Sequence, residues 1–296
     1  MYDTEELIIS VFCCVDDFLR QLTQGQRIRA RGFAPSLSDS EVLTMEIVGE
    51  FRGLDCDRYI WKYFHDHWLK LFPSMTSRST FVRQAANLWS YKQQLQQRLA
   101  EDLGAFQDSI HLIDGIPIPL CCFSRAKGCR LFAAESDYGY CAAKKETYYG
   151  FHGHLVVSAV GVITGFTLTP ANGSEQDAVW ELVGGIRGLL IGDKGYINSQ
   201  LQMELSQSAI NLQTPKRSNM KETRSKSLIR LLNRFRRLIE TVIGQLCERF
   251  NFEKVRARDM WHLTSRLNRK LLAHTVCIWL NRHSPNPLQF EQLLDQ

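Results

Sequence analysis

The chain has 296 residues, of which 44% are apolar and 23% are charged. This balance is typical of a globular protein, and the length allows two small domains or one large domain with a helical extension. The sequence contains no apolar run long enough to span a bilayer, and it begins with acidic residues where a secretory signal has basic ones. We therefore expect a soluble, cytoplasmic protein with no membrane partner.

Helices are predicted throughout the first hundred residues, because apolar and aromatic side chains recur there at helical spacing. A Ser-x-x-Glu capping box marks the start of the second helix, and a proline follows the third. The expected helices cover residues 8–22, 38–53, 59–72 and 78–103. Residues 1–105 are therefore predicted to form an all-helical N-terminal region.

Short helices joined by a tight connection also fit a helix-turn-helix motif within this region. Arg78, Arg83 and Gln84 would then face DNA from the helix that begins near residue 78. The alternative is a helical bundle with no role in reading DNA, since the region carries more acidic than basic residues.

From residue 106 to the C-terminus, the pattern changes to short apolar strands alternating with helices, which predicts a mixed α/β domain. The first strand is expected to end at Asp114, because Gly115, Pro117 and Pro119 interrupt the apolar run. The predicted strands are 110–114, 154–160, 164–169, 189–193 and 209–213, and the predicted helices are 174–183, 199–208 and 228–249.

Two acidic residues, Asp114 and Asp193, are predicted to lie at the ends of buried strands. If the two strands are neighbours in one sheet, their carboxylates converge at its edge. Two carboxylates held close together are unfavourable unless a cation neutralises them. The alternative is that each aspartate only caps a turn or a helix.

The helix over residues 228–249 offers a third carboxylate. At 100° per residue, Glu240 lies at the edge of the apolar face, where it can reach the strand ends, whereas Glu248 points outward. The alternative for Glu240 is an ion pair with Arg236 one turn earlier, worth only about 0.2–0.5 kcal/mol.

Three carboxylates form an oxygen-only site that suits Mg²⁺ or Mn²⁺. Two such ions roughly 4 Å apart can promote displacement at a phosphodiester.

His152 and His154 share one face of a strand, and the sequence leaves open whether they bind metal or are structural. The nine cysteines have irregular spacing and no Cys-x-x-Cys pair, so we expect reduced thiols, with zinc as the alternative for the group Cys121, Cys122, Cys129 and Cys141.

The net charge of +5 is distributed unevenly along the chain. Residues 1–110 carry 12 Lys/Arg against 15 Asp/Glu, residues 111–212 carry 7 against 9, and residues 213–296 carry 17 against 7. Clustered basic residues favour a polyanion, because each neutralised phosphate releases counterions. The basic residues in the last third of the chain thus predict nucleic-acid binding. The alternative is that they form a solvent-exposed charged face on ordinary helices.

Four segments together resemble the DDE transposases of bacterial insertion sequences. The acidic residues are separated by 79 and 47 residues, and the resemblance extends over roughly residues 110–282. The segments are Leu112-Ile-Asp-Gly115, Leu190-Ile-Gly-Asp-Lys-Gly-Tyr196, Thr214-Pro-Lys-Arg-Ser-Asn-Met220 and Ile239-Glu-Thr-Val242.

The resemblance implies a ribonuclease-H-like fold and two divalent metal ions, Mg²⁺ or Mn²⁺, held by Asp114, Asp193 and Glu240. It also implies cleavage at the element's ends by water and attack of the freed 3′-hydroxyl on target DNA. The expected partners are terminal inverted repeats, target DNA and further copies of the chain, in the nucleoid of a bacterial cell. The alternatives are a nuclease of the same fold without strand transfer and a non-catalytic DNA-binding regulator.

Several basic residues are predicted to contact DNA. Some related enzymes carry a Tyr, an Arg and a Lys around the glutamate; here Arg236 matches, while Asn233 and Cys247 replace the other two. The full predicted set is Arg78, Arg83, Lys194, Lys216, Arg217, Arg230, Arg234, Arg236 and Arg237.

Overall fold

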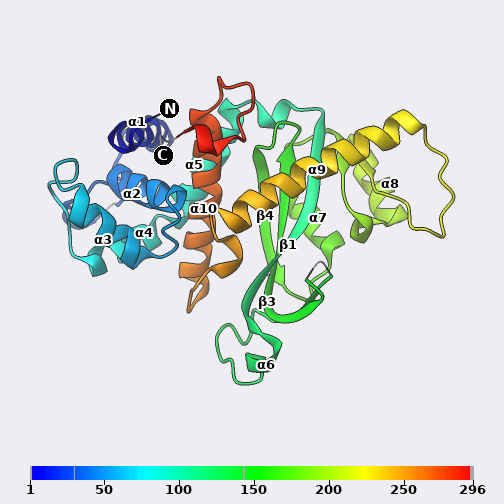
Figure 1. Ribbon diagram of the computed structural model, residues 1–296, viewed down its shortest axis with the longest axis horizontal. Coiled ribbons are helices and arrows are strands. Elements are labelled where there is room, and N and C mark those ends of the chain that lie inside the picture. Colours follow the sequence, from blue (N-terminus) through cyan, green and yellow to red (C-terminus); the bar gives the residue numbers. More distant parts are fainter. Residues whose placement is uncertain (1, 30, 143, 294–296) are drawn as a thin grey trace. The chain divides into compact units, whose positions relative to one another are not determined.

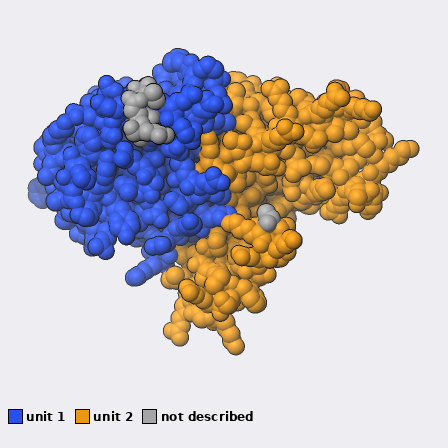
Figure 2. Space-filling model, in the orientation of Figure 1, with its two compact units in different colours: residues 1–99, 246–296 blue, residues 100–245 orange. Residues whose placement is uncertain are grey.

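The fold was analysed in a computed structural model, which describes residues 2–29, 31–142 and 144–293. The chain divides into two compact units, residues 1–99 with 246–296 and residues 100–245 (Figure 2). We call them unit 1 and unit 2 and describe each by itself. No helix in the described part of the chain is long and apolar enough to cross a bilayer.

Unit 1 is helical, as predicted for the N-terminal region (Figure 1). The predicted capping box opens α2, where Ser38 Oγ accepts from Glu41 N and Glu41 Oε2 accepts from Ser38 N. A helix from the end of the chain, α10, packs against α1, α2 and α4. The helices are α1 (Thr4–Thr23), α2 (Asp39–Phe51), α3 (Asp57–His67), α4 (Arg78–Asn87), most of α5 (Trp89–Asp102) and α10 (Met260–Leu280).

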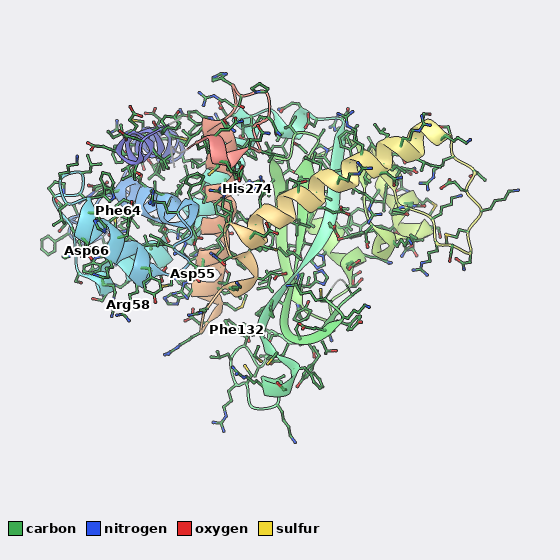
Figure 3. All side chains as sticks on the ribbon, viewed as in Figure 1. Asp55, Arg58, Phe64, Asp66, Phe132 and His274 are labelled. Atoms are coloured by element: carbon green, nitrogen blue, oxygen red, sulfur yellow. The ribbon has the colours of Figure 1, made fainter. Side chains whose placement is uncertain are left out.

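Aromatic side chains fill the interior of unit 1. Phe64 of α3 is fully buried and packs edge to face on Phe72, with 5.0 Å between ring centroids (Figure 3). His274 of α10 packs between Phe250 and Phe290. Burial lowers the pKa of His274 to about 3, so this imidazole is neutral at physiological pH.

A buried network of charges ties α10 to the N-terminal helices of unit 1. Arg269 Nε lies 2.6 Å from Glu50 Oε1, and Lys270 Nζ lies 2.8 Å from Glu50 Oε2. Lys92 Nζ lies 2.8 Å from Glu46 Oε1, and Arg269 also pairs with Asp57. Removing one partner would leave an uncompensated buried charge, which typically costs about 3–5 kcal/mol.

The buried network changes what the uneven charge distribution along the chain implies for DNA binding. Arg269 and Lys270 neutralise acids of the N-terminal helices in the interior of unit 1, so these two basic residues cannot serve a DNA surface. Counted by unit, Lys/Arg against Asp/Glu is 20 to 17 in unit 1 and 16 to 14 in unit 2. A strongly basic stretch remains at residues 216–237, which carry nine Lys/Arg and one acidic residue.

The units also divide the chain differently from the predicted ranges 1–105 and 106–296. The first boundary, after residue 99, is close to the predicted one, but residues 246–296 group with the N-terminal helices. Hydrophobic periodicity identifies α10 as a helix without showing which surface it packs against.

Unit 2 contains the predicted mixed sheet flanked by helices. The strand order is β2-β3-β1-β5-β6, with β4 paired to β3; β1, β5 and β6 are parallel, and the remaining pairs are antiparallel. In Figure 1, α9 crosses in front of this sheet. The elements are β1 (Ile110–Cys122), α6 (Phe123–Ala126), β2 (Asp137–Cys141), β3 (Glu146–Ser158), β4 (Ile163–Pro170), α7 (Glu175–Leu182), β5 (Gly188–Ile191), α8 (Ser199–Gln207), β6 (Ile210–Gln213) and α9 (Lys226–Glu248).

The predicted end of the first strand at Asp114 is wrong, because β1 continues to Cys122. β1 pairs with β5 only as far as Leu112, while it pairs with β3 along most of its length. Beyond Leu112 one side of β1 has no paired strand among the described residues, and prolines are tolerated at such an edge. Pro117 and Pro119 therefore do not end the strand.

Candidate active site

Asp114 lies in β1 and Asp193 follows the end of β5, the strand that pairs with β1. The parallel pairing of β1 and β5 aligns Leu112 with Ile191, and each aspartate follows two residues later. Asp193 Oδ1 accepts from Gly195 N at 2.6 Å and caps the short 3₁₀ turn η2 (Lys194–Tyr196). Both aspartates therefore lie just beyond the point where β1 and β5 cease to pair.

A negative charge on Asp114 is unfavourable in the folded protein. Its pKa is raised to about 6, chiefly because burial disfavours the charged form and also because Asp193 is nearby. A hydrogen bond of 2.8 Å from Gly115 N to Asp114 Oδ1 acts in the opposite direction. A proton or a cation at this site would relieve the unfavourable charge.

Glu240 of α9 lies at the margin of this site. It raises the pKa of Asp114, whereas Arg236 lowers it, so both side chains are within electrostatic reach of Asp114. The Glu240 side chain is 60% exposed, and its Oε1 lies 3.9 Å from Arg236 Nη2. Within the described residues, no three His, Cys, Asp or Glu side chains form a group that could hold a metal ion.

A further carboxylate near the aspartates, that of Glu175, was not predicted. Its pKa is raised to about 7, because burial disfavours the charge and Asp193 and Asp114 repel it. The sequence pattern indicated only a helix start here, with Ser174 as N-cap, and Ser174 Oγ does accept from Asp177 N. An acid in the first turn of a helix is common, so it gave no separate signal.

Two buried polar atoms near the acids have no hydrogen-bond partner among the described residues: Tyr196 Oη and His152 Nε2. The His152 imidazole fills the space beside Gly115, and burial lowers its pKa. It stacks on His154, with 4.7 Å between ring centroids, and His154 Nε2 lies 2.9 Å from Thr169 Oγ1. His154 thus has a structural partner in β4, while His152 lies next to the aspartates.

The basic residues predicted to contact DNA are mostly exposed. Lys216 is half-buried, because its Nζ donates to the carbonyl of Lys221 at 2.6 Å and also contacts Thr223. Arg236 is 37% exposed beside Glu240. The exposed members are Arg78, Arg83, Lys194, Arg217, Arg230, Arg234 and Arg237.

Gln84, which we predicted to face DNA, is instead buried. Its Nε2 donates to the Leu37 carbonyl at 3.0 Å and to Asp39 Oδ1 at 2.8 Å, so it fastens α4 to the start of α2. Residues 68–77 separate α3 from α4, a longer connection than the 3–4-residue turn of a helix-turn-helix.

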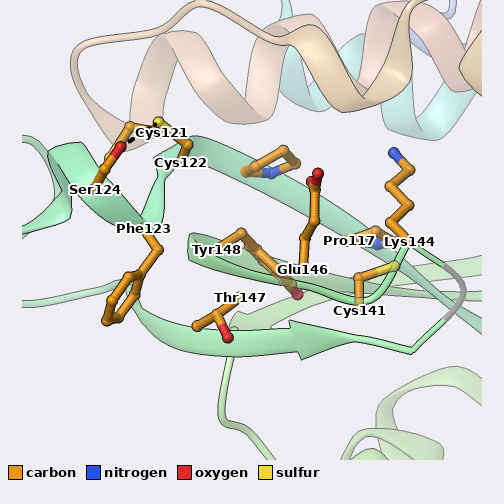
Figure 4. A pocket seen from close by; sticks show the side chains of 11 residues that line it. Pro117, Cys121, Cys122, Phe123, Ser124, Cys141, Lys144, Glu146, Thr147 and Tyr148 are labelled. Atoms are coloured by element: carbon orange, nitrogen blue, oxygen red, sulfur yellow. Dashed lines mark hydrogen bonds between the residues drawn. The ribbon is translucent and has the colours of Figure 1, made fainter.

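A pocket of about 570 Å³ opens between β1, β2 and β3 (Figure 4). Three cysteines of the group noted above line it: Cys121, Cys122 and Cys141. Cys122 Sγ lies 3.3 Å from Ser124 Oγ, and all nine cysteines of the chain are free.

We predict that Asp114→Asn stabilises the metal-free protein, and more so as the pH rises. With a folded pKa of about 6, Asp114 is protonated more readily in the folded than in the unfolded protein. Stability is therefore lost as the pH rises through 6. Urea unfolding in EDTA should show a gain for the variant of about 1–3 kcal/mol at pH 8 and a smaller gain at pH 5. Glu240→Gln, at an exposed site, should stay within about 0.5 kcal/mol of wild type; a gain for Asp114→Asn that does not grow with pH would contradict the prediction.

More than half of the sequence matches a known protein family. Residues 104–260 match the sequence model of a family described as "Transposase DDE domain". Because the match covers more than half of the chain, the protein belongs to this family, which confirms the predicted DDE transposase domain.

Among solved structures, the chain is similar to a piggyBac transposase, determined by cryo-EM as a synaptic complex with hairpin DNA. The TM-score is 0.51 at 11% sequence identity, over 99% of this chain and 79% of the other. At this sequence identity, the similarity supports a shared fold alone. No curated protein matches the chain in sequence.

Proposed function

We propose that the protein cleaves DNA at the ends of a mobile element and joins them to target DNA, with two Mg²⁺ or Mn²⁺ ions held by Asp114, Asp193 and Glu240. The observation that carries the proposal is the pair Asp114–Asp193, each two residues beyond the last paired position of β1 and β5, inside the family's domain. Glu240 is assigned as third ligand because it lies within electrostatic reach of Asp114.

The pair of carboxylates Asp114 and Asp193 fits a divalent cation. Asp114 carries a raised pKa beside Asp193, and carboxylate oxygens are the donors that Mg²⁺ and Mn²⁺ prefer. When bound, such ions activate an attacking oxygen and stabilise a leaving one. The chain's own contribution is to fix the carboxylates at a strand junction and to keep one of them largely out of water.

The proposed substrate is DNA, in the form of terminal inverted repeats and a target. The basic stretch at residues 216–237 supports contacts with phosphates, and the similar transposase was solved with hairpin DNA. We further propose a ribonuclease-H-like catalytic region within residues 106–296, a DNA-reading role for the N-terminal helices, and several copies of the chain acting together on DNA.

The test is incubation of the purified protein with labelled DNA that carries the element's own ends, together with a target plasmid. We expect cuts at the ends with Mg²⁺ or Mn²⁺, none in EDTA, and joining of the cut ends to the plasmid. Cleavage without joining would favour the nuclease alternative. Binding without cleavage in either metal would favour the regulator and overturn the proposal.

Arg78 and Arg83, exposed at the start and in the middle of α4, are expected to affect recognition of the ends more than overall affinity. Replacing both with Ala should narrow the ratio of affinities for end-containing and random DNA by about tenfold. Arg58→Ala, at an exposed residue of α3, is the control. Competition binding measures the ratio; if it is unchanged in the double variant, α4 does not read DNA.

A further inference from the structure

The first turn of α7 brings Glu175 against the turn that follows Asp193. Glu175 Oε2 occupies the space that a side chain at residue 195 would need: Glu175 Cδ lies 2.9 Å and Asp193 Oδ1 3.0 Å from the position of a Cβ on Gly195. Both carboxylates therefore lie beside Gly195, and the missing side chain of this residue leaves room for them.

Hydrogen bonds fix α7 in this position. Gln176, next to Glu175, donates from Nε2 to the Gly195 carbonyl at 3.4 Å and accepts from Asn198 Nδ2 at 2.6 Å. A charged side chain held half-buried beside another charge of the same sign is unfavourable by itself. Burial raises the pKa of the Glu175 carboxyl, and the neighbouring charges of Asp193 and Asp114 raise it further.

The buried hydroxyl of Tyr196 is a second, independent feature of the same acidic site. The Tyr196 side chain is fully buried, and its hydroxyl has no hydrogen-bond partner among the described residues. Its electrostatic neighbours are Glu175, Asp114 and Asp193. Buried hydroxyls almost always have a hydrogen-bond partner, so this donor is available to a carboxylate of the site.

We propose that Glu175 is a further ligand of the metal site, sharing a cation with Asp193, and that Tyr196 positions the ligating carboxylate through its hydroxyl. This inference rests on the proposed function, because it adds a residue to the metal site of the cleavage reaction. Ligating carboxylates commonly receive a hydrogen bond from a neighbouring side chain, which orients them. A cation also removes the repulsion that three neighbouring carboxylates otherwise exert on one another.

The experiment measures Mn²⁺ binding to the full-length protein, from the decrease of the free-ion EPR signal, in the absence of DNA. Glu175→Gln should weaken binding about tenfold or more. Glu175→Asp keeps the charge but shortens the side chain, so direct ligation predicts weaker binding for this variant as well. Asp177→Asn removes an exposed acid from the same helical turn and should bind as wild type. Thermal unfolding in EDTA checks that each variant is folded.

Wild-type Mn²⁺ affinity in Glu175→Asp would show that the residue acts only through its charge, and would overturn direct ligation. Wild-type affinity in Glu175→Gln, with weakened binding in Asp193→Asn, would remove Glu175 from the site and leave the proposed function standing. If Asp193→Asn also bound as wild type, the metal site itself would be misplaced and both proposals would fail. Tyr196→Phe should weaken Mn²⁺ binding less than Glu175→Gln; an unchanged affinity would overturn the role of Tyr196.

Discussion

Asp114→Asn, Asp193→Asn and Glu240→Gln should each reduce cleavage of end DNA by roughly a thousandfold or more, because residues that act as a catalytic unit show such losses when one is removed. Each substitution keeps the shape of the side chain and removes the negative charge that a divalent cation requires. Each variant should still fold, and its DNA affinity should change little. Strand cleavage in Mg²⁺ and Mn²⁺, with band-shift binding measured in parallel, gives the comparison.

Glu248→Gln is the matched control, since Glu248 is an exposed acid on the same helix as Glu240. It should cleave as wild type. If Glu240→Gln cleaves normally and Glu248→Gln is inactive, the third ligand has been assigned to the wrong face of α9. Normal cleavage by all of the variants would reject the metal site.

Replacing Lys216, Arg217, Arg230 and Arg234 together with Gln should lower nonspecific DNA affinity on the order of a hundredfold at low salt. These residues belong to the basic stretch at 216–237, and three of them are exposed. Fewer phosphate contacts release fewer counterions, so the slope of log affinity against log salt should become shallower by roughly 3 to 4. Fluorescence anisotropy at several salt concentrations measures both quantities.

Arg20→Gln is the control for this set, because Arg20 is exposed but lies on α1 and pairs with Asp16 at 2.8 Å. Its slope should equal that of wild type. An unchanged slope for the fourfold variant would place the phosphate contacts elsewhere. Arg269 and Lys270 are unsuitable for such a test, because their side chains are buried against Glu50 and their loss would destabilise unit 1.

Local patterns predicted much of unit 2. The apolar run before Asp193 predicted the strand that became β5, and the broad apolar face of α9 predicted a helix packed by one side. The prolines of β1 led to a wrong strand end, because a proline interrupts a strand only where a neighbouring strand would accept a hydrogen bond from the missing N–H. That neighbour is β5, which pairs with β1 only through Leu112.

Other features depend on contacts between residues far apart in sequence. Arg269 and Glu50 are separated by most of the chain, and neither periodicity nor composition indicates that they pair in the interior of unit 1. Glu175 has a first-turn position typical of a helix start, so its proximity to Asp193 emerges only when α7 packs against η2. Gln84 was mistaken for a surface residue for the same reason, because its partners lie on another helix.

The most direct test of the metal site is a change of ligand chemistry at Asp193. A thiolate is a softer ligand than a carboxylate and is poorly suited to Mg²⁺. If Asp193 holds the ion, Asp193→Cys should lose cleavage in Mg²⁺ and recover part of it in Mn²⁺, which raises the ratio of Mn²⁺ to Mg²⁺ rates above that of wild type. A ratio equal to that of wild type would contradict the assignment of Asp193 as a metal ligand.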